Sequence, residues 1–433
     1  MKLILFHYFS FFKPFPDLKV LQRMLIVCFL VLVIAQAASL PAYAYPDTSG
    51  VTAISERNIR FISYPDFPEA HSTWGSIGHN PVNNNIYIGV TNHADNVGYY
   101  EYDPTQDQIQ LHGFIKDLGY LRPYQWQGKI HSKIVAGPKG EMYFSTDGGE
   151  SRQEYLMNHP HGYAGGVFMK WNPASKQLTN LGMGMQYESI KDVEVDPQTG
   201  LIYAISYPQV HFLVYDPQKN HLHDAGRLGS AHVPRVLFTD WWGNCYYVDW
   251  RQRLVKYEKS TGKLIFAKQS LPAFPGTPGS KIVTGITAYA KNPGKNVIYL
   301  VTYGAKLVAF YPQETGVGKW EDLGGVFEMS KGEEWKPYVP NLNVGLNGKL
   351  YYVIGGHGNF VRKDKTVLVE FDPQERKAKI LFEYPIGQLT EATGSDIRDK
   401  DGNLYFAGRK RAANTEHGSV PFLIMFNPEK EVK

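Results

Sequence analysis

Apolar and polar residues alternate over short stretches along most of this chain, and the stretches are separated by turns rich in Gly, Asn, Asp and Pro. Alternation with a period of two is typical of strands that bury one face. The segment 129–149, KIHSKIVAGPKGEMYFSTDGG, is representative, because two apolar runs flank a Pro-Lys-Gly turn and the second run has Tyr143 at its centre. With no heptads and no long helical period, the pattern predicts an all-β fold of many short antiparallel strands.

A tight turn followed by a strand with a central tyrosine occurs seven times. These tyrosines are Tyr87, Tyr143, Tyr203, Tyr246, Tyr299, Tyr351 and Tyr405. After each one comes a strand that carries an aromatic residue and mostly ends at an Asp-Pro or Asn-Pro turn. The aromatic residues are Tyr102, Trp171, Tyr215, Tyr257, Phe310, Phe371 and Phe426.

Seven such units predict a seven-bladed β-propeller of four-stranded antiparallel blades, spanning residues 45–433. The segment 58–65, NIRFISYP, precedes the first unit, and we expect it to supply the outer strand of the last blade and so close the ring. WD dipeptides do not recur and Gly-Gly pairs are irregular, so the repeats indicate neither the WD-repeat nor the kelch class.

The first 44 residues have the features of a secretory signal peptide. Lys19 and Arg23 precede the apolar run 24–36, and the small-x-small site Ala42-Tyr43-Ala44 follows it, with cleavage expected after Ala44. An uncleaved anchor is the alternative, although the run is shorter than the ~20 residues of a spanning helix. The sequence therefore predicts a secreted or periplasmic protein with an N-terminal signal peptide, residues 1–44, and no membrane contact after cleavage.

Charge and cysteine content narrow the possible partners. The formal net charge of +4 falls to about +1 once residues 1–44 are removed, so bulk charge favours no particular partner and does not indicate nucleic-acid binding. Cys28 lies in the predicted signal, which leaves Cys245 as a single cysteine without an intrachain disulfide. A lone cysteine is either a small buried residue or a metal ligand.

The blade topology predicts that two sets of loops meet on one rim of the ring. The loops before the innermost strands carry His71, His131, Tyr187, Arg227, His232, Arg235, Lys281, Tyr338 and Glu391. The loops after the tyrosine strands carry His93, Asp147, His159, His161, Tyr207, Arg251, Tyr303, His357, Arg409 and His417. Most of the 14 histidines are therefore expected on this rim, and the long loop 148–166 is a candidate functional loop.

The residue types on this rim favour one class of reaction. Ordinary glycoside hydrolysis needs two carboxyl groups ~5–9.5 Å apart, and the sequence does not fix a second acid beside either Asp147 or Glu391. A G-x-S-x-G elbow and a phosphate-binding glycine loop are also absent from the sequence. β-Elimination of a uronic acid fits better, because Arg or His can neutralise the sugar carboxylate while Tyr or His transfers protons.

Four segments, KIHSK, HGYAGG, YAISYPQVHFLVYDP and RLGSAHVPRVLFTDWWGNCYYVD, resemble the β-propeller polysaccharide lyases that cleave ulvan and, more distantly, the propeller-type oligogalacturonate lyases. The resemblance implies an exported lyase that cleaves a uronate-containing anionic polysaccharide or oligosaccharide by β-elimination. It matches His131 to a catalytic histidine, Tyr207 to the base and acid, and Arg227 to the arginine that neutralises the carboxylate.

The resemblance also has gaps. Asp147 stands where the family has a second histidine, so His159 or His161 must replace it, and we take His161 as the fourth catalytic candidate. His232 and Cys245 match a structural zinc site, but Tyr303 stands where a further ligand is expected. No other cofactor is implied. The candidate substrate-binding residues are Asp147, His159, Arg235, His357 and Arg409.

Two other classes remain open from the sequence. A non-catalytic propeller would bind a glycan or a protein through the same rim. A lactonase-like or dehydrogenase-like propeller normally shows a calcium-binding acidic cluster or a quinone-stacking Trp motif, and neither is evident in the sequence.

Overall fold

The computed structural model describes eleven stretches of the unit Ala44–Lys433. These are residues 58–92, 97–122, 127–147, 165–228, 236–272, 285–303, 305–326, 339–355, 365–385, 389–412 and 418–430. The predicted signal peptide lies outside them. In these stretches, no helix combines the length and the apolar character that crossing a membrane requires.

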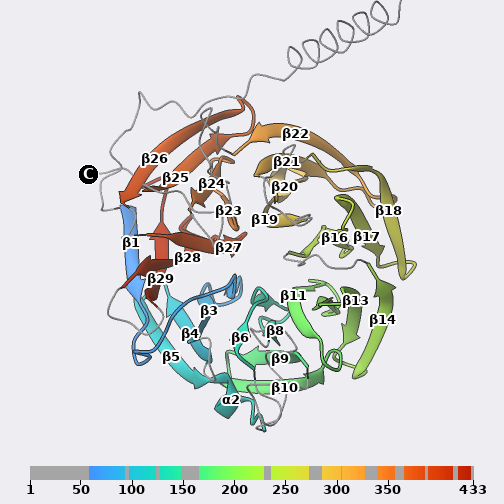
Figure 1. Ribbon diagram of the computed structural model, residues 1–433, viewed down its shortest axis with the longest axis horizontal. Coiled ribbons are helices and arrows are strands. Elements are labelled where there is room, and N and C mark those ends of the chain that lie inside the picture. The colour runs from blue at the N-terminus through green and yellow to red at the C-terminus, as the bar shows by residue number, and fades with distance from the viewer. Residues whose placement is uncertain are drawn as a thin grey trace, which may run out of the picture. The chain divides into compact units, whose positions relative to one another are not determined.

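The described residues form six sheets arranged around an axis, and the strands pair antiparallel except at one place (Figure 1). Four sheets contain four strands each: β2 (Ile77–His79), β3 (Ile86–Thr91), β4 (Val97–Asp103) and β5 (Gln108–Phe114); β11 (Ser189–Val195), β12 (Ile202–Tyr207), β13 (His211–Asp216) and β14 (His221–Arg227); β15 (Phe238–Thr239), β16 (Cys245–Val248), β17 (Arg253–Glu258) and β18 (Lys263–Ser270); and β19 (Ile286–Asn292), β20 (Val297–Thr302), β21 (Lys306–Tyr311) and β22 (Lys319–Gly325). A fifth sheet contains β6 (Lys129–Ile130), β7 (Val135–Ala136), β8 (Met142–Asp147), β9 (Val167–Asn172) and β10 (Gln177–Met183).

The remaining strands form one continuous eight-stranded sheet. Its strands are β23 (Asn341–Val344), β24 (Leu350–Ile354), β25 (Lys365–Asp372), β26 (Lys377–Pro385), β27 (Glu391–Ser395), β28 (Leu404–Arg411), β29 (Ser419–Phe426) and β1 (Ile59–Ser63). The described helices are short: α2 (Ile115–Leu118) and the 3₁₀ helix η4 (Pro293–Lys295).

The sheet pairing confirms an all-β propeller with four-stranded antiparallel blades but corrects the predicted blade count. Five sheets stand as separate blades, whereas the prediction required seven. The other eight strands are joined by a parallel pairing between β23 and β27, in which Asn341 lies opposite Gly394 and Leu342 opposite Ser395. Innermost strands converge toward the axis, and β23 and β27 come close enough there to form hydrogen bonds with each other.

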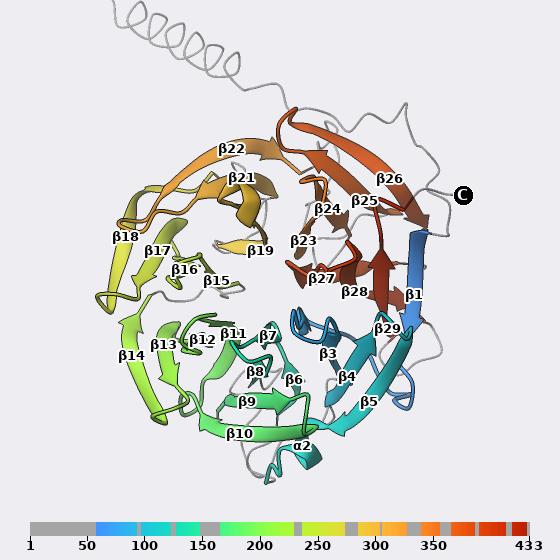
Figure 2. The same cartoon turned by 180° about the vertical axis from the view of Figure 1, so that it is seen from behind.

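The predicted closing strand is confirmed. Residues of β1 pair antiparallel with β29, with Ile59 opposite Phe426 and Ser63 opposite Phe422. Figure 1 shows the blue N-terminal strand beside the red C-terminal one, and Figure 2 shows the same junction from behind. The ring is therefore closed by hydrogen bonds between the two ends of the described chain.

The recurring turn and tyrosine form one hydrogen-bonded unit, which explains why they repeat together. The Asp240 carboxylate accepts hydrogen bonds from the backbone N–H of Asn244 at 2.9 Å and from the Tyr246 hydroxyl at 2.9 Å. Asp399 accepts the hydroxyl of Tyr405 at 2.7 Å in the same way. In these two repeats the buried tyrosine thus fills the core with its ring and fixes the adjacent turn with its hydroxyl.

The strand directions place several chain segments on one rim. Within a blade, the innermost strand begins at this rim, the tyrosine strand returns to it, and the outer strand ends at it. The ends of β8, β12 and β16 and the residues just before β7 therefore lie on the same side of the ring. This rim carries the candidate site.

Candidate functional site

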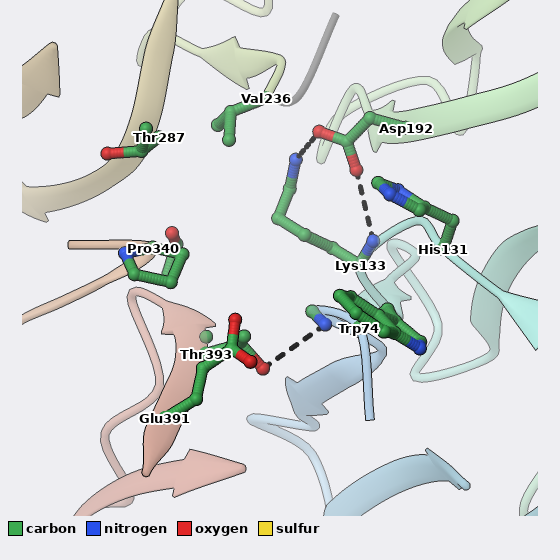
Figure 3. Close-up of a pocket in the computed structure, with 12 residues that line it drawn as sticks. Trp74, His131, Lys133, Asp192, Val236, Thr287, Pro340, Glu391 and Thr393 are labelled. Carbon is green, nitrogen blue, oxygen red and sulfur yellow. Dashed lines mark hydrogen bonds and ion pairs between the residues drawn. The ribbon is translucent and has the colours of Figure 1, made fainter. Parts of the chain in front are cut away.

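A cavity with about 470 Å³ of empty space, including the part open to solvent, lies where the innermost segments converge. It is lined by Trp74, Gly75, His131, Lys133, Asp192, Val236, Thr287, Pro340, Glu391, Thr393, Gly394 and Ser395. Figure 3 shows His131, Lys133 and Trp74 on one side of it and Thr287, Pro340 and Thr393 on the other. The cavity is thus assembled from every part of the ring.

His131 is buried in this wall, and its ring orientation is fixed by the neighbouring blade. Nδ1 lies 3.1 Å from the backbone carbonyl oxygen of Lys191. A carbonyl only accepts hydrogen bonds, so Nδ1 carries the proton, and Nε2 is the basic nitrogen of the neutral ring. His131 is therefore positioned to exchange a proton through Nε2.

Asp147, the last residue of β8, is a buried carboxylate surrounded by cations. It accepts a hydrogen bond from the Ser189 hydroxyl at 3.0 Å and forms an ion pair with the ammonium of Lys191. Burial raises the pKa of Asp147, but the positive charges of Lys191, Lys129 and, when it is protonated, His131 hold it well below its usual range. Asp147 therefore stays ionised and organises these cations, and it cannot serve as a proton donor near neutral pH.

Tyr207, the last residue of β12, shares Lys191 with His131. The Lys191 ammonium lies 5.1 Å from the centroid of the Tyr207 ring, while the Lys191 carbonyl bonds to His131. Tyr207 is half-buried and pairs with Ser189 across the β11–β12 ladder. One residue thus connects both proton-transfer candidates on the same rim.

Trp74 brings two further cations to this rim. The Lys129 ammonium lies 5.1 Å and the Arg409 guanidinium carbon 5.2 Å from the Trp74 ring centroid. Arg409 also forms an ion pair with Glu391 at 2.7 Å. We name the whole group the mouth cluster; its members are Trp74, Lys129, His131, Asp147, Lys191, Tyr207, Glu391 and Arg409. Three permanent cations face two carboxylates in it, which suits an anionic ligand.

Arg227 lies elsewhere. It is the exposed last residue of outer strand β14, not part of a loop before an innermost strand as predicted. Its Nε donates to the carbonyl oxygen of Gln209 at 3.0 Å, and it lines a separate surface groove. The structure therefore does not bring Arg227 into the mouth cluster.

Four other predicted catalytic and substrate-binding residues lie outside the described stretches: His159, His161, Arg235 and His357.

The surroundings of Cys245 do not fit the implied zinc site. The side chain is fully buried in β16 among apolar neighbours that include Phe212 and Leu237, and burial raises the pKa of its thiol well above the ordinary value. A zinc ligand must be a thiolate, which this environment disfavours. His232 lies outside the described chain, and the described residues contain no group of three or more His, Cys, Asp or Glu side chains arranged to hold a metal.

Sequence reasoning missed three members of the mouth cluster: Trp74, Lys129 and Lys191. Lys191 sits inside a strand, SIKDVEV, where alternating polar residues look like an exposed face. In an innermost strand those polar residues face the axis. Polar residues within a predicted innermost strand were therefore the signal that could have identified Lys191. Trp74 lies in the loop before β2, where the histidine at position 71 was the more obvious candidate.

Comparisons with known proteins support the fold alone. No family model matches the chain. A 160-residue segment is 29% identical to the quinohemoprotein alcohol dehydrogenase of Comamonas testosteroni, but the match covers 33% of this chain and 22% of that protein. The activity of that dehydrogenase therefore does not transfer to this chain.

Several solved propellers have a similar arrangement. The WD40 repeats of RRP9 superpose with a TM-score of 0.51 at 10% identity, covering 87% of this chain and 99% of that one. The Cps50 (Swd1) β-propeller domain of Myceliophteria thermophila gives 0.52 at 10% identity, covering 84% and 98%. YCF48 from Cyanidioschyzon merolae gives 0.50 at 10% identity, covering 86% and 100%.

Proposed function

We propose that this chain binds a uronate-containing anionic polysaccharide at the mouth cluster and cleaves it by β-elimination. The observation that carries the proposal is that His131 and Tyr207 both contact Lys191, on a rim that also holds Lys129 and Arg409. This arrangement combines two groups that transfer protons with cations that offset a sugar carboxylate.

Each of these residues takes the role in the reaction that its chemistry allows. The cations of the mouth cluster neutralise the uronate carboxylate, which makes the α proton more acidic. Tyr207 removes that proton, and the electron pair forms the carbon–carbon double bond as the bond to the β oxygen breaks. For this step Tyr207 is the phenolate and His131 the imidazolium, so the Nε2–H of His131 supplies the proton that the departing oxygen takes up. Arg227 has no part in this step because it lies on outer strand β14.

We also infer that the ring contains seven repeats, with the eight-stranded sheet counted as two. Its order places β27, β28, β29 and β1 on one side of the parallel pairing and β23 to β26 on the other. Each group has the strand order of a separate blade. Export of the mature protein belongs to the same proposal, because a polysaccharide substrate lies outside the cell.

A panel assay tests the proposed reaction. The mature chain is incubated separately with ulvan, pectate, alginate and glycosaminoglycans, and near-ultraviolet absorbance of the unsaturated product is followed. We expect a steady rise with at least one polymer. Retention on an immobilised polymer without any rise in absorbance would instead establish a non-catalytic glycan-binding propeller. If the protein is not retained by any polymer and no absorbance develops, both functions are excluded.

Replacement of Trp74 tests whether the mouth cluster is the binding surface. Trp74→Ala removes the ring with which Lys129 and Arg409 make cation–π contacts. Contacts of this kind contribute about 0.5–2 kcal/mol. We expect Kd for the retained polymer to rise by about 2- to 30-fold, as measured by isothermal calorimetry. Tyr120→Ala, which removes an aromatic side chain that is 88% exposed, is the matched control. Equal affinities for both variants would remove Trp74 from the binding surface.

A further inference from the structure

A second groove on the rim combines arginines with exposed aromatic rings. It lies between the outer parts of the β11–β14 and β15–β18 sheets and has about 950 Å³ of empty space, including the part open to solvent. Its chemically informative lining residues are Arg227, Asp249, Trp250, Arg251, Arg253 and Phe266. None of the reaction steps above uses this groove.

Each exposed ring in the groove carries a guanidinium group. The Arg251 guanidinium carbon lies 4.7 Å from the Trp250 ring centroid, and that of Arg253 lies 5.3 Å from Phe266. Trp250 is 41% exposed and Phe266 44% exposed. Both rings line the same groove, and a flat exposed ring offers a platform for a sugar face.

The groove is positively charged and its loop is rigid. The Asp249 carboxylate is buried, accepts the backbone N–H groups of Arg251 at 2.9 Å and Arg253 at 2.8 Å, and binds the Arg253 guanidinium through two hydrogen bonds. Asp249 therefore neutralises Arg253 and fixes the turn. No carboxylate in the described chain pairs with Arg251, whose charge is left for a ligand.

The groove adjoins the mouth cluster along the rim. Strands β12 and β14 both end on this rim, and the Arg227 Nε donates to the carbonyl of Gln209, two residues beyond Tyr207. The turn 249–252 follows β16 on the same rim. A polymer that leaves the mouth cluster past Tyr207 therefore reaches Arg227 first and Trp250 next.

We propose that this groove is an outer subsite for the same anionic polysaccharide, in which a sugar ring packs on Trp250 while its acidic group binds Arg251 and Arg227. This inference rests on the proposed polysaccharide ligand, but it does not require cleavage. It identifies the ligand as an extended polymer rather than a mono- or disaccharide, because the groove lies outside the axial cavity.

Retention on immobilised polysaccharide tests the outer subsite separately from catalysis. The probe is the anionic polymer of the panel that retains the wild-type protein best, with dextran as the neutral polymer. We expect Trp250→Ala and Arg251→Ser each to weaken the affinity for the anionic polymer about fivefold or more. Dextran should retain neither the wild-type protein nor the variants. The matched control is Arg376→Ser, an exposed arginine at the turn between β25 and β26.

The two proposals fail in distinguishable ways. Weakened retention in both groove variants with no absorbance change in the wild type would support the outer subsite and reject the lyase. Unchanged retention in a folded Arg251→Ser variant, checked by its thermal midpoint, would overturn the subsite even if the lyase assay is positive. A wild-type protein that no anionic polymer retains would overturn it as well.

Discussion

Tyr207→Phe is expected to lower the rate of unsaturated-product formation by about 10²–10⁴-fold, the usual contribution of a positioned proton-transfer group. The change removes only the hydroxyl oxygen. The ring remains, so Lys191 keeps its position over the ring face and the β11–β12 pairing is preserved. Initial rates by absorbance give the effect on turnover, and retention on the same polymer gives the effect on binding, which we expect to stay within about threefold.

The matched control for this substitution is Tyr120→Phe, which removes a hydroxyl from a residue that is 88% exposed and outside the mouth cluster. Its rate should equal that of the wild type. If Tyr207→Phe retained the wild-type rate, Tyr207 would not be the base, and His131 would have to account for both proton transfers. A loss of retention together with rate would instead make Tyr207 a binding residue.

Most of the fold was predictable because its signals are local. In several repeats the turn and the tyrosine form one hydrogen-bonded unit, as in Asp240 with Tyr246, so sequence repetition reports structural repetition directly. The closing strand β1 was also predictable, since a propeller that begins part-way through a blade needs an extra outer strand. The parallel contact between β23 and β27 was not, because it depends on how closely two innermost strands approach through space.

The residues of the candidate site also separate into those that the sequence could predict and those that it could not. His131, Asp147 and Tyr207 were placed on one rim by strand direction alone, and the structure connects them through Lys191. Arg227 was misplaced because the sequence does not show where an outer strand ends and the next loop begins. Pairwise contacts between blades, such as that of Lys129 with residue 74, link positions far apart in sequence and leave no periodic signal.

Lys133 connects three blades near the axis. Its ammonium pairs with Asp192, lies 3.4 Å from Glu194, and donates to the carbonyl oxygen of Leu237 at 2.8 Å, which connects three consecutive sheets near the axis. Burial lowers the pKa of Lys133, but the two carboxylates raise it above its ordinary value. Lys133 therefore remains charged, and its charge compensates carboxylates that are almost completely buried.

Lys133→Met keeps the apolar stem but leaves these carboxylates without their cation. Breaking a buried ion pair in this way is expected to lower the free energy of unfolding by about 3–5 kcal/mol, as measured by urea denaturation of the mature chain. Lys268→Met, at an exposed position on β18, is the matched control and should change it by less than about 0.5 kcal/mol. Adding Asp192→Asn to Lys133→Met should recover part of the loss, because it removes one uncompensated charge while keeping an oxygen for the Leu237 N–H. A loss below about 1 kcal/mol in the single variant would instead indicate that water reaches these carboxylates and that the axis is held by the hydrogen bonds between strands.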